Sequence, residues 1–227
     1  MVKHIAIILD GNRRFARKLG REPWEGHSYG LKKLEYLFGW CREFGIKELT
    51  LYAFSTENFS RSRKEVVYIM GLFREYIEKL RDDRELEKIG ARVRFIGRIG
   101  MFSKGIQKGM KELMERTMGN SKFTINFAMG YGGRAEIVDS INSILNKAKN
   151  NRRIKINEKL IKNNLYLASE PEIVIRPGGE VRTSNFLMWQ SAYSEWFFAR
   201  KYWPEFTKAD LRKILEEYRK RERRFGT

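Results

Sequence analysis

The stretch HIAIILDGNRRF, residues 4–15, decides the fold predicted for this chain. Its first half is a continuous apolar run rich in isoleucine, which predicts a buried strand. Asp10, Gly11 and Asn12 follow as turn or helix-capping residues, and basic residues continue beyond them. The local prediction is therefore a strand, a tight turn and a helix, with a carboxylate at the carboxyl end of the strand. Ligands bind at that edge in open α/β sheets.

This turn has the composition of a phosphate site. The amino end of a helix, with the guanidinium groups of Arg13 and Arg14 added, suits a phosphate or a diphosphate. The Asp10 carboxylate beside it suits a divalent cation that bridges to that phosphate. The same residues would also make an ordinary capped helix with a solvated basic first turn, and this stretch alone does not decide between the two interpretations.

The composition is that of a globular protein with anionic partners. Its 227 residues include 46 Lys and Arg against 28 Asp and Glu, for a formal net charge of +18. This excess predicts binding to nucleic acid, phosphorylated small molecules or an acidic membrane surface. The single cysteine, Cys41, excludes an intramolecular disulfide and a cysteine-based zinc site. With no apolar run long enough to span a bilayer and no signal peptide predicted, we expect a cytoplasmic protein, with peripheral contact to the cytosolic membrane face left open.

Strand and helix patterns alternate along the chain. Further strands are predicted over residues 48–54, 92–97, 122–129, 172–176 and 194–199. Helical patterns separate them, and the one over residues 64–87 has a wide apolar face that would pack on the sheet or line an apolar cavity. This alternation predicts an α/β fold with a mostly parallel six-stranded sheet flanked by helices. We expect residues 1–227 to form a single domain.

Polar clusters follow several of the predicted strands and would meet at one edge of a parallel sheet. They are Asp10–Arg14, Ser55–Arg61 and Arg176–Ser184. Glu195 is grouped with them, because a carboxylate in an apolar run needs a partner. Such an edge would hold arginines for two phosphorylated ligands among aromatic and aliphatic residues. This mixture suits a molecule with a diphosphate head and an apolar body, whereas nucleic acid needs exposed stacking platforms and is not an expected partner.

Long motifs in this chain resemble the cis-prenyltransferases, the family of undecaprenyl and dehydrodolichyl diphosphate synthases. They read HIAIILDGNRRFARK, LTLYAFSTENFSR, YGGRAEIVD and IRPGGEVRTSNFLMWQSAYSEWFF, in the family's order, and span almost the whole chain. The resemblance implies a homodimeric, Mg²⁺-dependent enzyme that condenses isopentenyl diphosphate onto an allylic primer, farnesyl or geranylgeranyl diphosphate. The product would be a Z-polyprenyl diphosphate, the precursor of a glycosyl carrier lipid, which grows into an apolar tunnel at one end of the fold.

The resemblance also implies roles for individual residues. Asp10 would bind Mg²⁺ and act in catalysis, Glu195 would complete the metal site, and Asn58 is the family's proposed proton acceptor. Because a neutral amide is a poor base, we expect the proton to go to a phosphate oxygen or to Asp10, with Asn58 orienting groups. The two diphosphates would have separate sites. The allylic one would contact Gly11, Asn12, Arg13, Arg14, Phe15, His27, Ser55, Thr56, Glu57, Phe59 and Arg61, and that of isopentenyl diphosphate would contact Arg176, Arg182, Thr183 and Ser184.

The chain departs from the family pattern at one contact and keeps it at the C-terminus. Pro23 stands where the family often has an arginine, and whether Arg21 replaces that arginine is left open. The C-terminal sequence of this chain resembles the C-terminal sequence of the family, which in family dimers completes the site of the neighbouring subunit. Arg221, Arg223 or Arg224 would then reach the isopentenyl diphosphate of the partner.

Two alternative functions stay open. One is prenyl transfer to an acceptor other than isopentenyl diphosphate, and the other is a non-catalytic basic binding or partner subunit. The first would show a departure around Arg176, Arg182 and Ser184, and the second would lack Asp10 or the turn after it. Both features are intact here, which favours the synthase.

Overall fold

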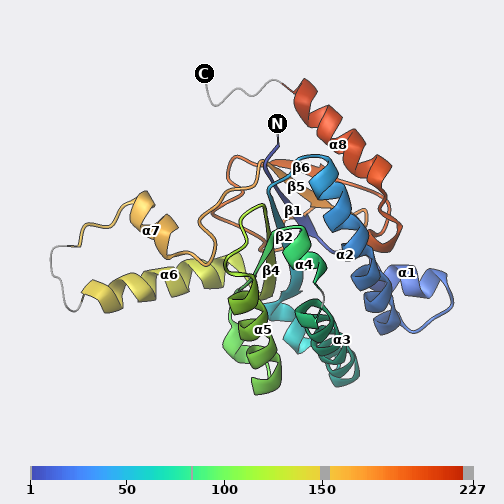
Figure 1. The fold of residues 1–227 in the computed structure, drawn as a ribbon, viewed down its shortest axis with the longest axis horizontal. Coiled ribbons are helices and arrows are strands. Elements are labelled where there is room, and N and C mark those ends of the chain that lie inside the picture. The colour runs from blue at the N-terminus through green and yellow to red at the C-terminus, as the bar shows by residue number, and fades with distance from the viewer. Residues whose placement is uncertain (1, 83, 149–153, 222–227) are drawn as a thin grey trace.

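The computed structural model describes residues 2–82, 84–148 and 154–221, and their centre is a single sheet (Figure 1). The sheet has six strands in the order β3-β4-β2-β1-β5-β6, and every pair runs parallel. The strands are β1 His4–Ile8, β2 Glu48–Ser55, β3 Ala91–Ile96, β4 Phe123–Tyr131, β5 Ile173–Arg176 and β6 Glu195–Phe198. The predicted α/β fold class is thereby confirmed.

Helices connect these strands. They are α1 Asn12–Lys18, α2 Gly26–Glu43, α3 Arg63–Asp82, α4 Glu85–Lys88, α5 Lys104–Thr117, α6 Gly133–Ala148, α7 Glu158–Asn164 and α8 Lys208–Lys220, with short 3-10 turns η1 Pro23–Glu25, η2 Thr56–Ser60, η3 Ile99–Met101 and η4 Trp203–Glu205. The helix predicted over residues 64–87 is instead divided, since α3 ends at Asp82 and the short α4 begins at Glu85, with Leu86 buried in the same core as Leu80. None of the helices described is both long and apolar enough to cross a bilayer.

Side chains alternate between the two faces of the sheet along each strand. Each face is therefore packed against a different set of residues. On one face, Ile5 and Ile7 of β1 belong to a large core that includes residues of α2, α3, α5 and α8. On the other face, Ala6 and Ile8 pack with Phe186 and other residues of the connections around β5. Helices α6 and α7 extend to one side of the sheet (Figure 1).

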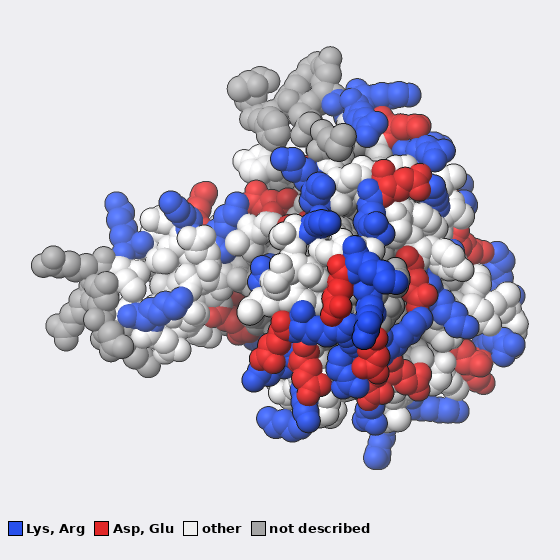
Figure 2. Space-filling model, viewed as in Figure 1, with Lys and Arg blue, Asp and Glu red and all other residues white. Residues whose placement is uncertain are grey.

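The net charge of +18 does not make the face in Figure 2 uniformly basic. Acidic side chains are interspersed among basic ones over α3 and α5 (Figure 2). Arg81 of α3 donates to Glu112 of α5 at 3.2 Å, for example. Pairing of this kind gives little stability at the surface. Among the coloured residues of the face in Figure 2, acidic side chains interrupt the basic ones, so they form no continuous basic stripe there of the kind that a nucleic-acid backbone would need.

A polar cluster is buried at the amino ends of the central strands. The His4 Nε2 atom lies 2.8 Å from Thr50 Oγ1. Asn126 Nδ2 donates to the same hydroxyl at 3.0 Å and to Glu48 Oε1 at 2.7 Å. Burial lowers the pKa of His4 below its ordinary value of 6.5, although the carboxylates of Glu48 and Glu172 oppose this change. The folded protein therefore favours the neutral imidazole.

We predict that His4 makes the folded state less stable as the pH falls below about 6.5. The unfolded chain then takes up a proton that the folded chain resists, so the free energy of unfolding decreases, whereas this effect is absent well above that pH. Urea unfolding at about pH 8 and about pH 5.5 would measure the change. The His4→Asn variant should lose less stability between the two conditions than the unmodified protein, and an equal loss in both would contradict the prediction. His27, which is half-buried and also has a lowered pKa, contributes equally to both proteins.

Candidate active site

The turn after β1 fixes Asp10 at the carboxyl edge of the sheet. Gly11 has a φ of 98°, and a Cβ atom there would lie 2.8–3.0 Å from atoms of Tyr202, so only glycine fits. The Gly11 amide donates to Asp10 Oδ1 at 2.6 Å. The Phe15 amide then donates to the Gly11 carbonyl and begins α1. The predicted strand, turn and helix are confirmed.

Asp10 is held by two arginines. Arg176 donates to its Oδ2 atom from Nη2 at 2.8 Å and from Nε at 3.3 Å, and Arg14 Nη2 donates to Oδ1 at 3.2 Å. Arg176 ends β5, beside β1, and is only 4% exposed, so its charge requires close partners. Its Nη1 atom also donates to Ser184 Oγ at 2.7 Å and to the Arg182 carbonyl. Asp10 thus joins the two arginine clusters that the sequence predicted.

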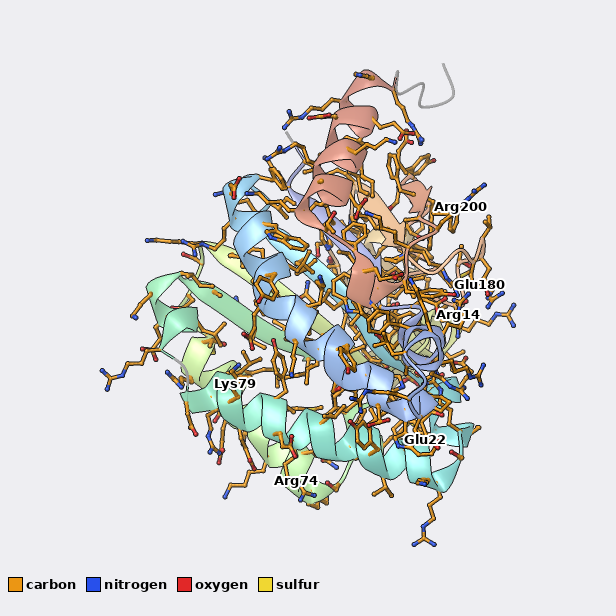
Figure 3. The ribbon with its side chains drawn as sticks, turned by 90° about the vertical axis from the view of Figure 1, so that its right-hand side faces the viewer. Arg14, Glu22, Arg74, Lys79, Glu180 and Arg200 are labelled. Atoms are coloured by element: carbon orange, nitrogen blue, oxygen red, sulfur yellow. The ribbon has the colours of Figure 1, made fainter. Side chains whose placement is uncertain are left out.

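A second carboxylate lies between the same clusters. Glu180 accepts a hydrogen bond from Arg14 Nη1 at 3.1 Å and another from Arg182 Nη1 at 2.7 Å. Arg14 and Glu180 lie close together at this edge of the molecule (Figure 3). An anion bound here would compete with Asp10 and Glu180 for the same N–H groups, and a diphosphate offers more acceptor oxygens than either carboxylate.

Three basic side chains surround the carboxylate of Glu65, which lies in the first turn of α3. Arg61 Nη1 donates to Glu65 Oε1 at 2.9 Å, and Arg13 Nε lies 3.7 Å from the same oxygen. His27 Nε2 lies 3.3 Å from it, and because a carboxylate only accepts, this nitrogen carries the proton. Glu65 is 3% exposed, and the hydrogen bond from His27, followed by the charge of Arg61, lowers its pKa. The sequence interpretation missed Glu65, although its spacing of four residues from Arg61 signals a helical ion pair.

A cavity of about 600 Å³ opens at this edge and is bounded by the sheet, α2 and α3. Many of the predicted site residues line it, namely Asp10, Asn12, His27, Ser55, Glu57, Asn58, Arg61, Arg176, Arg182 and Ser184. Helix α3 begins near this polar edge and contributes Ile69, Phe73, Ile77 and Leu80 to the wall. These residues are on successive turns, so the apolar part of the cavity extends along the helix.

The other predicted residues lie outside the cavity wall. They are Gly11, Arg13, Arg14, Phe15, Thr56, Phe59, Thr183 and Glu195. The Phe59 ring packs edge-on against Phe54 at 4.9 Å, so it supports the wall from behind. Arg21, the substitute considered for the arginine missing at Pro23, is more than half exposed and pairs with Glu25 at 3.7 Å. The structure therefore does not place Arg21 on the wall.

Asn58 helps to shape the loop after β2. Its Oδ1 atom accepts a hydrogen bond from the Ser55 amide at 3.1 Å, which closes the turn η2. The amide oxygen is therefore already engaged within the protein. This arrangement fits a residue that orients groups at the cavity wall.

Glu195 does not lie beside Asp10 within one chain, which corrects its grouping with the other polar clusters. It begins β6 and pairs in register with Ile173, which in turn pairs with Ile5 at the amino half of β1. A residue that starts a strand and a residue that follows one lie at opposite edges of a parallel sheet. Glu195 instead accepts a hydrogen bond from Arg221. A metal role for Glu195 stays a prediction.

The described residues contain no group of three or more His, Cys, Asp and Glu side chains arranged to hold a metal ion. The cavity wall nevertheless carries the Asp10 carboxylate beside several arginines. Mg²⁺ is commonly held by one or two carboxylates together with substrate phosphates and water. Asp10 therefore fits a magnesium ion that arrives with a diphosphate.

The chain is similar to known proteins over almost its whole length. A prenyltransferase family model, described as undecaprenyl diphosphate synthase, matches residues 8–226. The chain is 48% identical to the tritrans,polycis-undecaprenyl-diphosphate synthase (geranylgeranyl-diphosphate specific) of Thermococcus kodakarensis, over 99% of this chain and 86% of that protein. It is 49% identical to the protein of the same name from Pyrococcus furiosus, with the same coverage.

A solved structure shows the same likeness. The lavandulyl diphosphate synthase from Lavandula x intermedia, in complex with dimethylallyl diphosphate, superposes with a TM-score of 0.93 at 30% identity, over 100% of this chain and 98% of the other. These matches define the class as prenyl-transferring enzymes. Within that class, the chain belongs to the undecaprenyl diphosphate synthase family. The resemblance predicted from the sequence motifs is confirmed.

Proposed function

We propose that this chain is a Z-prenyl diphosphate synthase that condenses isopentenyl diphosphate onto an allylic primer. The observation that carries the proposal is a cavity whose polar end holds Asp10, bonded to both Arg14 and Arg176, and whose apolar wall continues along α3. The names of the two archaeal relatives specify geranylgeranyl diphosphate, so we infer that this compound is preferred to farnesyl diphosphate as the primer. The product would then be an undecaprenyl diphosphate.

Each arginine cluster would bind one of the two diphosphates. The allylic diphosphate would lie against Arg13, Arg14 and Arg61, and the diphosphate of isopentenyl diphosphate would lie against Arg176 and Ser184. Breaking the allylic C–O bond places negative charge on the leaving diphosphate, which the guanidinium groups stabilise. Positive charge develops on carbon, and the apolar wall protects that carbon from water. Holding both substrates side by side, in the orientation that the reaction needs, would supply much of the rate acceleration.

The proton that leaves C2 of isopentenyl diphosphate needs an acceptor. We assign it to a phosphate oxygen or to Asp10, because the amide of Asn58 is a weak base and its oxygen already accepts from Ser55. Magnesium, held by Asp10 and phosphate oxygens, would neutralise charge on the leaving diphosphate. In this arrangement Glu195 would reach such an ion only from a second subunit.

A homodimer is part of the proposal. Helix α6 exposes Val138, Ile141 and Leu145, and apolar side chains of this kind favour contact with a second copy. Of the C-terminal arginines, Arg221 contacts Glu195, whereas Arg223 and Arg224 lie outside the described residues.

The net charge of +18 and the apolar product also favour contact with an anionic membrane surface.

The experiment that tests the function combines purified protein, labelled isopentenyl diphosphate, Mg²⁺ and either geranylgeranyl or farnesyl diphosphate. We expect label in long-chain products, with faster incorporation from the geranylgeranyl primer, as resolved by thin-layer chromatography. Absence of elongation with every allylic primer would refute the proposal. Prenyl products formed from dimethylallyl diphosphate alone would favour the alternative acceptor chemistry.

We predict that Glu65→Gln raises the KM for the allylic primer about tenfold, which corresponds to about 1.4 kcal/mol of binding. Glutamine keeps a similar shape but loses the negative charge that holds Arg13 and Arg61 together. Steady-state kinetics with each substrate varied in turn would measure the effect, and the KM for isopentenyl diphosphate should change little. The control is Glu35→Gln, which breaks an exposed pair with Lys79 on α3. An unchanged primer KM in Glu65→Gln would contradict the prediction.

A further inference from the structure

The segment after Arg182 has an uncommon backbone conformation. Among the non-glycine residues that the structure describes, positive φ angles occur at Ser184 (49°), Asn185 (64°) and Leu187 (46°). This left-handed region is unfavourable for most residues, and asparagine tolerates it better than others. Such a conformation persists only where surrounding contacts hold it.

The side chain of Asn185 supplies contacts of this kind to two separate elements. Its Oδ1 atom accepts a hydrogen bond from the Arg134 amide at 2.9 Å, and its main-chain carbonyl accepts one from the Gly133 amide at 2.7 Å. Both amides belong to the first turn of α6. The Nδ2 atom donates to Glu57 Oε1 in η2 at 3.2 Å. One amide group therefore ties the loop after β5 to α6 and to the loop after β2.

The space around this amide is filled. A Cβ atom on Gly132 would lie 2.8 Å from Asn185 Nδ2 and 2.9 Å from Thr56 Oγ1, so the chain comes close on this side. Asn185 is itself half-buried and lies on the cavity wall. Tight surroundings and three hydrogen bonds leave this residue little freedom to move.

The neighbouring Ser184 makes two contacts with the site. Its Oγ atom accepts from Arg176 Nη1 at 2.7 Å, and its carbonyl accepts from Tyr52 Oη at 3.3 Å. A shift of Ser184 would therefore remove one of the acceptors that orient the buried guanidinium of Arg176, the same group that binds Asp10. Asn185 is the next residue along the chain after Ser184.

We propose that Asn185 is a positioning residue for the subsite that binds isopentenyl diphosphate. By holding the left-handed turn against α6 and η2, it keeps Ser184 and Arg176 in the orientation that accepts this diphosphate. The inference rests on the proposed function, because it takes isopentenyl diphosphate as the ligand of this cluster.

The test compares Asn185→Ala with Asn185→Gly. Alanine removes the side-chain contacts and also disfavours the left-handed backbone, whereas glycine removes the contacts but adopts that backbone readily. We expect Asn185→Ala to raise the KM for isopentenyl diphosphate about tenfold, the loss of one to two hydrogen bonds. Asn185→Gly should raise it about threefold, and the KM for the allylic primer should change less than that in both variants.

The control is Asn157→Ala, which also removes an asparagine that caps a helix, since Asn157 Oδ1 accepts from the Leu160 amide at 2.9 Å at the start of α7. A merely structural role for Asn185 would lower the melting temperature in both alanine variants and leave the KM for isopentenyl diphosphate unchanged, which would overturn the inference.

Calorimetric titration with isopentenyl diphosphate alone separates this inference from the proposed function. If the unmodified protein binds it but does not elongate the primer, the proposed function fails, and a weaker Kd in Asn185→Ala still supports the positioning role. An unchanged Kd in that variant overturns the positioning role, whereas the proposed function is decided by elongation alone.

Discussion

Replacement of Asp10 by asparagine is expected to lower kcat about a thousandfold while the protein stays folded. Asparagine keeps the shape of the side chain, and its oxygen can still accept from Arg176. It loses the negative charge that a bound magnesium ion requires and that balances Arg14 and Arg176. Turnover at saturating substrate measures the loss, and circular dichroism with a thermal melt checks the fold.

A matched control isolates the role of this carboxylate. Asp139 also receives two hydrogen bonds from one arginine, because Arg98 Nε and Nη2 donate to it at 2.9 and 3.0 Å, but this pair is exposed and away from the cavity wall. Asp139→Asn should retain normal turnover. If Asp10→Asn also retained more than about a tenth of the turnover, the assignment of Asp10 to the reaction would be wrong.

The second large effect is expected at Arg176. Arg176→Lys should lower kcat/KM for isopentenyl diphosphate about a hundredfold, because two charge-assisted hydrogen bonds are lost. The planar guanidinium group of Arg176 donates to Asp10, Ser184 and the Arg182 carbonyl at the same time. The ammonium group of a lysine has one nitrogen and cannot reproduce this geometry. The charge is kept, so the change tests geometry.

Steady-state kinetics with each substrate varied separately would measure this loss. We expect most of it to fall on isopentenyl diphosphate and less on the allylic primer. The control is Arg98→Lys, which alters the exposed pair with Asp139 and should leave both kinetic constants unchanged. A normal kcat/KM in Arg176→Lys would show that this guanidinium group does not bind the substrate.

The sequence predicted the sheet well because its signals are local. The apolar run from His4 to Leu9 and the turn that follows it specify a strand and its carboxyl end without reference to the rest of the chain. The parallel arrangement then brings Ser55 and Arg176 to the same edge as Asp10. Much of the polar cavity wall could be predicted in this way.

The remaining parts of the site depend on contacts between distant residues. Glu180 pairs with Arg14 across 166 positions, and Asn185 reaches Glu57 across 128, so no local pattern reveals either contact. The burial of Glu65 under three basic groups is likewise a property of the packed fold. The prediction that Glu195 lies with Asp10 is wrong, because Glu195 begins its strand whereas Asp10 follows one, and these two positions lie at opposite edges of a parallel sheet.

One measurement tests the central claim most directly, namely a crystal structure of the protein with Mg²⁺, isopentenyl diphosphate and a thio analogue of geranylgeranyl diphosphate that reacts slowly. We predict two diphosphates beside Asp10 at the polar end of the cavity, one on Arg61 and Arg14 with its apolar chain along α3, and the other on Arg176 and Ser184. A diphosphate bound away from Asp10, or a prenyl chain directed away from α3, would contradict the account.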